Sequence, residues 1–110
     1  MSKSSAIIKK RKAKPDFPSA HPGEVLREDF LTPLGMSQYA LAKALGVAQL
    51  RLSEICRGKR AVSADTALRL ARYFGTSPEF WLGMQASYEL AAARDAAGDL
   101  IENVVKPRAA

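Results

Sequence analysis

The sequence contains few of the residues on which many enzymes and secreted proteins depend. It has one cysteine, Cys56, and one histidine, His21, among 110 residues. A single cysteine excludes an internal disulfide, and the two residues together are too few for the usual cysteine and histidine zinc sites. There is no glycine-rich phosphate loop, and Ser53 has no basic partner nearby in the sequence. We therefore expect no enzymatic activity, no catalytic residues, no bound metal and no cofactor.

Long apolar runs are also missing, although 47% of the residues are hydrophobic. A membrane-spanning helix needs roughly 20 consecutive apolar residues, and no segment of the sequence approaches that length. The first residues also lack the apolar segment of a secretion signal. The sequence therefore predicts a cytoplasmic protein without a membrane contact, whose apolar residues suffice for one compact core.

Acidic residues are absent from the N-terminal stretch, where basic residues concentrate. Six of the 17 basic residues precede Pro15, at positions 3, 9, 10, 11, 12 and 14, and they account for the net charge of +6. Because apolar residues are scarce there, residues 1–20 are predicted to be a disordered basic tail. Three roles stay open for this tail: a solvating segment, an arm that contacts DNA, or a segment that becomes ordered on a protein partner.

Apolar residues at helical spacing predict an all-α chain. Helices are expected at about residues 23–31, 38–45, 48–56 and 64–74, and from a cap at Thr76 or Ser77 to about residue 97. Gly98 is expected to break the last helix, and residues 100–105 fit either a helix or a strand. The core candidates are Val25, Leu26, Phe30, Leu31, Leu41, Leu45, Val47, Leu52, Ile55, Ala67, Leu68, Leu70, Ala71 and Phe74.

Residues 37–60 read as two short helices joined by a glycine turn. Ser37 is a good N-cap for the first helix, and Gly46 suits the left-handed position that ends it. Leu52 and Ile55, three residues apart, would face the core from the second helix. This layout is typical of a helix-turn-helix, in which the second helix enters the major groove of DNA.

The side of the second helix opposite Leu52 and Ile55 is largely polar. At about 100° per residue, that side and its flanks carry Gln49, Leu50, Arg51, Ser53, Glu54 and Arg57. Most of these side chains can bond to base edges or phosphates. Lys59 and Arg60, which follow Gly58, add charge for the phosphate backbone. The pattern predicts a DNA-binding face, and the alternative is an ordinary surface helix with a solvated side.

Aromatic residues concentrate in the fifth helix, where Phe80, Trp81 and Tyr88 accompany Met84. They carry more apolar surface than one small helix can bury on a four-helix core. We therefore expect these four residues to contribute to a dimer interface. Plain core packing is the alternative, above all for Trp81.

A long collinear part of the sequence is similar to a known family. From HPGEVLREDFLTPLGMSQYALAKALGV through AVSADTALRLARYFGTSPEFWLGMQASYEL, it resembles the HigA-type antitoxins of the Xre/Cro repressor class. The resemblance implies a five-helix Xre or lambda-repressor-like domain over residues 21–76, with a helical C-terminal extension for dimerisation over residues 77–110. It further implies a homodimer that binds a palindromic operator and represses its own operon. Neutralisation of a cognate RelE-like mRNA interferase toxin is also implied.

The resemblance assigns roles to single residues. Gln38 would contact phosphate, and the bases would be read by Gln49, Leu50, Arg51 and Ser53. Two residues depart from the family pattern, because Leu50 replaces a polar residue and Ala48 replaces a capping residue. Leu50 would either read a thymine methyl group or weaken specificity. The loss of the cap at Ala48 costs roughly 1 kcal/mol unless another group satisfies the free N–H groups.

Two other interpretations of the function remain open at this stage. The protein would be a solitary Xre-type regulator if no toxin accompanies it. Alternatively, it would be an antitoxin that acts through toxin binding alone, an interpretation that the apolar Leu50 on the outward side favours.

Overall fold

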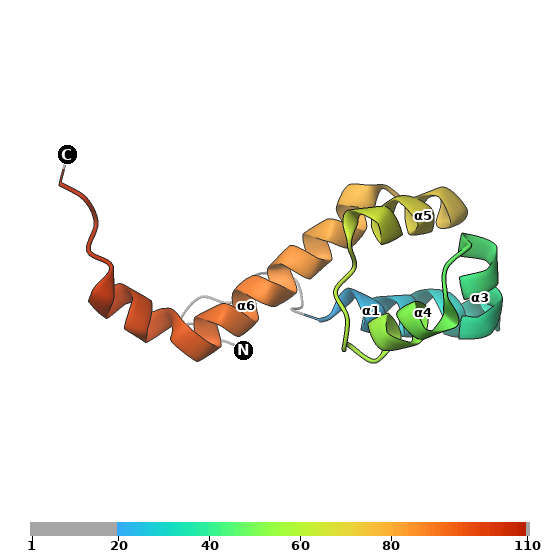
Figure 1. The fold of residues 1–110 in the computed structure, drawn as a ribbon, viewed down its shortest axis with the longest axis horizontal. Coiled ribbons are helices and arrows are strands. Elements are labelled where there is room, and N and C mark those ends of the chain that lie inside the picture. The colour runs from blue at the N-terminus through green and yellow to red at the C-terminus, as the bar shows by residue number, and fades with distance from the viewer. Residues whose placement is uncertain (1–19, 110) are drawn as a thin grey trace, which may run out of the picture.

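A computed structural model describes residues 20–109, and within this range the chain is all-α with no strand (Figure 1). The first helical stretch is continuous and comprises α1 (Pro22–Val25), a π-helix (Leu26–Leu31) and α2 (Thr32–Leu34). Four further helices follow: α3 (Gln38–Leu45), α4 (Gln49–Cys56), α5 (Ala64–Phe74) and α6 (Pro78–Val104). The predicted all-α, five-helix fold is confirmed. Residues 1–19 of the predicted disordered tail lie outside the described range.

Serine side chains begin three of the helices, as the sequence predicts. The hydroxyl groups of Ser37, Ser63 and Ser77 accept hydrogen bonds from N–H groups in the first turns of α3, α5 and α6. Ser77 is therefore the cap of α6. Thr76 has a different partner, because its Oγ1 accepts a hydrogen bond of 2.8 Å from the Trp81 indole nitrogen. Gly46, at φ 71°, ends α3 in the left-handed region as expected.

The first helical stretch continues past its predicted end at Leu31. A proline such as Pro33 ordinarily stops a helix, since it lacks an N–H group and its ring clashes with the carbonyl four residues earlier. The preceding turns instead widen into a π-helix, in which the Thr32 N–H group bonds to the Arg27 carbonyl. Wider winding accommodates the proline within the helix. The stretch ends at Gly35, whose φ of 62° is left-handed.

The core forms where the first stretch, α3, α4, α5 and the beginning of α6 meet. Its fully buried large side chains include Leu26, Leu41, Leu52, Ile55, Leu70 and Trp81. Ala67 and Ala71 are also buried, so α5 approaches its neighbours with a small-residue face. The prediction for Leu68 was wrong, because its side chain is 60% exposed on the outer side of α5.

Helix α6 is longer than the sequence pattern indicates. It includes Gly98 and continues to Val104, so the predicted break was wrong and residues 100–104 are helical. A glycine inside a helix costs about 1 kcal/mol relative to alanine, which the alanine-rich turns around it offset. Beyond its contact with α5, the helix projects from the body of the fold and bends before its end (Figure 1).

The contact between α1 and α4 is made by backbone atoms at Gly23. A Cβ atom added to Gly23 would lie 1.7 Å from the carbonyl oxygen of Ile55. Only glycine therefore permits this approach. One turn later, the Arg27 guanidinium donates a hydrogen bond to the Cys56 carbonyl at the C-terminal end of α4. The first helical stretch thus fixes the position of α4.

Replacement of Gly23 should test this contact directly. We expect Gly23→Ala to lower the free energy of unfolding by about 1–3 kcal/mol, the usual cost of overpacking. Gly98→Ala is the matched control, since its nearest neighbour would be the Arg94 Cβ at 4.0 Å. This control should raise stability by about 0.5–1 kcal/mol. Urea unfolding monitored by circular dichroism measures both, and an unchanged Gly23→Ala midpoint would contradict the close backbone packing.

Candidate nucleic-acid interface

Helix α4 has one buried and one accessible side. Leu52, Ile55 and Cys56 are buried, which confirms the predicted inner face. Gln49 and Leu50 are exposed at the start of the helix, and the Leu50 side chain is 62% exposed. Of the other predicted DNA-contacting residues, Arg57, Lys59 and Arg60 are exposed, whereas Gln38, Arg51, Ser53 and Glu54 are half-buried. Apart from Gln38 at the start of α3, the predicted residues thus gather at α4 and the turn that follows it.

The N-terminal end of α4 has no side-chain cap. Ala48 occupies the cap position with extended backbone and makes no side-chain hydrogen bond. The N–H groups of the first turn lack partners within the helix. Together they form the positive end of the helix dipole, which favours an anion such as phosphate. The departure at Ala48 therefore leaves these donors available to a ligand.

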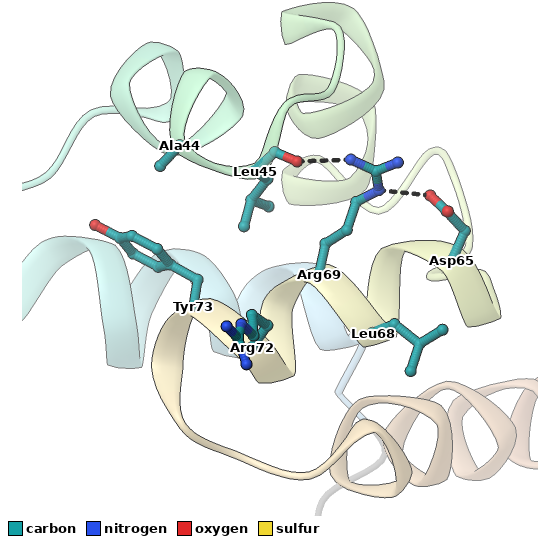
Figure 2. Close-up of a pocket in the computed structure, with 7 residues that line it drawn as sticks. All are labelled: Ala44, Leu45, Asp65, Leu68, Arg69, Arg72 and Tyr73. Carbon is teal, nitrogen blue, oxygen red and sulfur yellow. Dashed lines mark hydrogen bonds and ion pairs between the residues drawn. The ribbon is translucent and has the colours of Figure 1, made fainter.

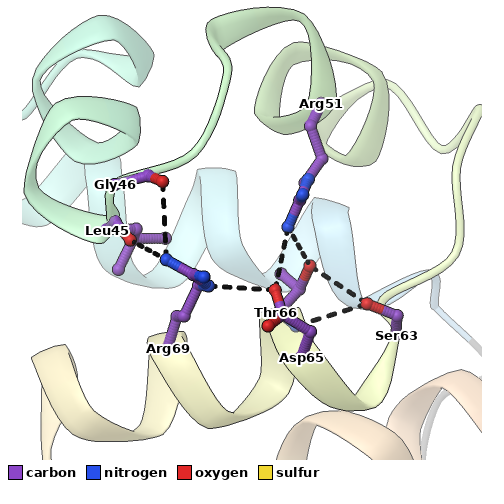
Figure 3. A network of polar contacts seen from close by, with 7 residues as sticks. All are labelled: Leu45, Gly46, Arg51, Ser63, Asp65, Thr66 and Arg69. Carbon is purple, nitrogen blue, oxygen red and sulfur yellow. Dashed lines mark hydrogen bonds and ion pairs between the residues drawn. The ribbon is translucent and has the colours of Figure 1, made fainter.

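Arg51 is held by the start of α5. Its guanidinium donates to the Asp65 carboxylate at 3.0 Å and to the Thr66 hydroxyl at 3.4 Å (Figure 3). The Thr66 hydroxyl also bonds to the Ser63 hydroxyl at 3.2 Å. These contacts orient Arg51 along the junction of α4 and α5, where sequence reasoning expected a freely accessible base-reading side chain.

Arg69 connects α5 to the turn of the helix-turn-helix. It donates to the Leu45 carbonyl at 2.8 Å and to Asp65 at 2.9 Å, and so spans a groove between α3 and α5 (Figure 2). Hydrogen bonds from Arg69, followed by those from Arg51, lower the pKa of Asp65 below its ordinary value. Neither residue is assigned a role from the sequence, although Asp65 and Arg69 are four residues apart on α5, a spacing that favours an ion pair. The contacts of Arg69 with the Leu45 carbonyl and of Asp65 with Arg51 join α5 to other helices and have no local sequence signal.

The turn after α4 is shaped by a second ion pair. The Arg60 guanidinium lies 2.7 Å from the Glu54 carboxylate, and Gly58 adopts a left-handed φ of 73°. The Lys59 N–H group bonds to the Glu54 carbonyl at 2.8 Å. As a result the exposed side chain of Lys59 is carried on a turn that is anchored to the helix. Glu54 therefore serves to orient Arg60 in the free chain.

His21 contributes to the packing that holds α4 in position. Its Nδ1 accepts a hydrogen bond of 2.9 Å from the Gly23 N–H group, so His21 is the N-cap of α1. Its ring packs edge-on against Tyr88 of α6 at a centroid distance of 5.0 Å. Burial lowers the pKa of His21 from its ordinary 6.5, while a backbone hydrogen bond at Arg60 and the Glu89 charge act in the opposite sense. From its sequence position, His21 was expected only at the edge of the predicted disordered tail. Its role as a helix cap was not predicted.

The four predicted dimer residues do not behave alike. Trp81 is fully buried within one chain, so its assignment to an interface was wrong and the core alternative is correct. Met84 packs partly against the core, and Tyr88 lies against His21. Phe80 is 41% exposed and contacts Phe30 at a ring distance of 6.3 Å. Only Phe80 offers substantial apolar surface to a partner.

A short helix with an exposed outward side, set by a glycine turn against a second helix, defines the helix-turn-helix class. A helix-turn-helix family model matches residues 26–81. The chain belongs to this family and, within it, to the HigA-type antitoxins of the Xre class. This is a class of DNA-binding antitoxins and regulators and not a class of enzymes.

Several individual proteins are similar to this chain. Virulence-associated protein I of Dichelobacter nodosus is 54% identical over 80 residues, which span 73% of this chain and 74% of that protein. The Pseudomonas aeruginosa antitoxin HigA, solved with the higBA promoter, is 44% identical with a TM-score of 0.80. That match covers 84% of this chain and 100% of the HigA chain. The antitoxin GraA in complex with its operator is 44% identical with a TM-score of 0.80, over 89% and 99% of the two chains.

His21 should make the stability of the fold depend on pH. The unfolded chain binds a proton near the ordinary pKa of 6.5, and the folded chain binds it only at a lower pH. The stability that neutral His21 contributes is therefore fully present above the ordinary pKa of 6.5. It is lost as the pH falls through the lowered pKa of the folded chain. We expect the free energy of unfolding to decrease from about pH 6.5 downward.

His21→Asn is the variant that tests this assignment, because asparagine caps a helix without titrating. Its urea midpoint should change less than that of the parent protein between about pH 7 and pH 5. Since His21 is the only histidine, an identical pH dependence in the two proteins would contradict the assignment.

Proposed function

We propose that this protein is a cytoplasmic antitoxin that binds the operator of its own operon as a homodimer and represses transcription. It would also neutralise a cognate RelE-like mRNA interferase toxin. The observation that carries the DNA-binding part is the accessible side of α4, with exposed Gln49 and Leu50 beside an uncapped helix start. Relatives solved with promoter or operator DNA, at TM-scores of 0.80, support it.

In this proposal, α4 enters the major groove with its N-terminal end toward the bases. Gln49, Arg51 and Ser53 would bond to base edges, and Leu50 would contact a thymine methyl group. Gln38, the free N–H groups of α4, and the exposed basic turn would bind phosphates. A homodimer would place two α4 helices in successive major grooves about 34 Å apart, so the operator would be palindromic.

The ion pairs of the free chain fit this mechanism. Arg51 shares Asp65 with Arg69, so it is one of two guanidinium groups around one carboxylate. These ion pairs are exposed, and exposed pairs contribute little to stability. A phosphate or a guanine edge can therefore compete with Asp65 for Arg51. Glu54 and Arg57, which flank the centre of α4, would adjust the charge facing the groove.

A mobility-shift titration against the DNA upstream of the gene tests operator binding. It compares two salt concentrations in the presence of a random duplex as competitor. We expect binding that resists the competitor at the higher salt, since base contacts persist where phosphate attraction weakens. Binding that the competitor removes would overturn the repressor proposal and favour an antitoxin that acts through its toxin alone.

Two substitutions separate base reading from phosphate binding. Lys59→Ala should weaken binding to all DNA sequences alike. It should also reduce the slope of log affinity against log salt concentration by ~1, as expected for one lost phosphate contact. Arg51→Ala should instead lose about 1–3 kcal/mol of discrimination at one position of each half-site. Lys106→Ala, beyond the end of α6, is the matched control and should leave binding unchanged. If Arg51→Ala behaves like Lys59→Ala, the base-reading role of Arg51 is wrong.

The toxin part is tested by co-expression with the neighbouring reading frame. That frame alone should arrest growth and cleave mRNA, and the present chain should suppress both effects and co-purify with its product. Absence of a toxic neighbour would favour the solitary Xre-type regulator.

A further inference from the structure

Arg51 uses only one of its guanidinium nitrogens for contacts within the part of the chain that the structure describes. Nη1 donates to the Asp65 carboxylate at 3.0 Å and, more weakly, to the Thr66 hydroxyl at 3.4 Å. A guanidinium carries five N–H groups in a planar fork, and two of them belong to Nη1. Over residues 20–109, neither Nε nor Nη2 of Arg51 has a hydrogen-bond partner. The edge formed by Nε and Nη2 therefore remains for a ligand.

The two partners of Nη1 are themselves held in place. Arg69 donates from its Nε to the same Asp65 oxygen at 2.9 Å, and from its Nη1 to the Leu45 carbonyl at 2.8 Å. Thr66 is buried, with only 1% of its surface exposed, so its hydroxyl has little freedom to move. Arg51 is thus fastened at one nitrogen to a frame that α3 and α5 build together (Figure 3).

An open hollow lies at the junction of α4 and α5, and Arg51 contributes to its lining. Arg60, Ala61 and Ser63 line the same hollow from the segment that connects the two helices. The Arg51 side chain is 33% exposed, so a group that enters the hollow can reach it. The hollow adjoins the basic turn that is proposed to bind phosphates. DNA bound to that turn would therefore bring either a base edge or a phosphate to Arg51.

The carboxylate of Asp65 favours a neutral ligand over an anionic one. The free edge of the Arg51 guanidinium matches two groups in DNA, the oxygens of a phosphate and the N7 and O6 acceptors of guanine. Asp65 lies 3.0 Å from the guanidinium, and 57% of its side chain is exposed. A phosphate on Arg51 would be repelled by this carboxylate, since like charges at short range raise the energy. A guanine edge carries no net charge and avoids that repulsion.

We propose that Asp65 is a positioning residue that presents Arg51 to a guanine base in each operator half-site. The carboxylate stays on Nη1 of Arg51, while Nε and Nη2 donate to N7 and O6 of the guanine in the major groove. Because Arg51 is already fastened, it loses less side-chain entropy on binding than a free arginine would. Arg69 acts one step further away, by holding the Asp65 carboxylate. The inference rests on the proposed function and adds to it the identity of one base.

Asp65→Asn tests the positioning role, with the full chain and a set of operator duplexes. Each duplex has one base pair of the half-sites replaced, and competition mobility shifts give the preference for the natural base at that position. We expect Arg51→Ala to reduce the preference at one guanine by about 10-fold, within the range of one bidentate pair. Asp65→Asn should reduce the preference at the same guanine by at least about 3-fold. The double variant should lose no more than Arg51→Ala alone, because the two residues act as one unit.

Binding to a random duplex separates positioning from a merely structural role. Removal of a negative charge near DNA should strengthen the binding of Asp65→Asn to the random duplex, while its preference for the guanine falls. A structural role would instead weaken binding to all duplexes alike. Glu79→Gln is the matched control, since it removes an exposed carboxylate from the first turn of α6. This control should leave the preference at every position unchanged, and both variants should keep the helical circular dichroism signal.

Replacement of the guanine by 7-deazaguanine, which lacks the N7 acceptor, tests the base contact itself. The parent protein should lose at least about 3-fold in affinity and Arg51→Ala should lose none, since only the parent makes the bidentate contact.

Three results would count against the inference, and they differ in what they leave standing. If Arg51→Ala loses preference at a guanine and Asp65→Asn does not, the positioning role of Asp65 is wrong and the proposed function stands. If the preference is lost at a base other than guanine, the assigned base is wrong. If Arg51→Ala weakens binding to all duplexes alike, Arg51 binds phosphate, and base reading by Arg51 in the proposed function fails together with the inference.

Discussion

The position of the accessible side of α4 depends on the backbone contact between α1 and the C-terminal end of α4. Gly23 lies so close to the Ile55 carbonyl that any side chain would clash with it. This approach brings the Arg27 guanidinium to the Cys56 carbonyl and His21 to the turn after α4. Carbonyl groups at a helix end have no partner within the helix, so the bond from Arg27 both satisfies the Cys56 carbonyl and orients α4. The first helical stretch, for which no DNA contact is predicted, thus sets the orientation of α4.

The other side of α4 is held by charged groups that are also candidates for DNA binding. Asp65 joins Arg51 and Arg69, and Glu54 joins Arg60. Such exposed pairs hold side chains in place but contribute little to the stability of the fold. They therefore reduce the side-chain entropy that would be lost on binding, without preventing exchange for a phosphate. Internal pairing of Arg51 in the free chain is consistent with a role in DNA binding.

The elements that the sequence predicted well are those with local causes. Serine caps and left-handed glycines act within four or five residues, and the inner face of α4 follows from its own periodicity. The errors concern effects that depend on distant residues. Gly98 stays helical because a long alanine-rich helix surrounds it, and Leu68 is exposed because its neighbours on α5 already fill the core. The position of His21 depends on Tyr88 in α6, which nothing near His21 in the sequence indicates.

The two halves of helix α6 have different surroundings. Its first half is anchored in the body, where Trp81 donates to Thr76 and the buried Gln85 accepts a hydrogen bond of 2.8 Å from the Val62 N–H group. That bond fixes the connection between α4 and α5. Its second half projects from the body, with Leu90, Leu100 and Val104 exposed. In the proposed homodimer, the contact between the two chains would set the distance between their α4 helices, and so the spacing of the operator half-sites. The bases recognised within each half-site would be determined by α4.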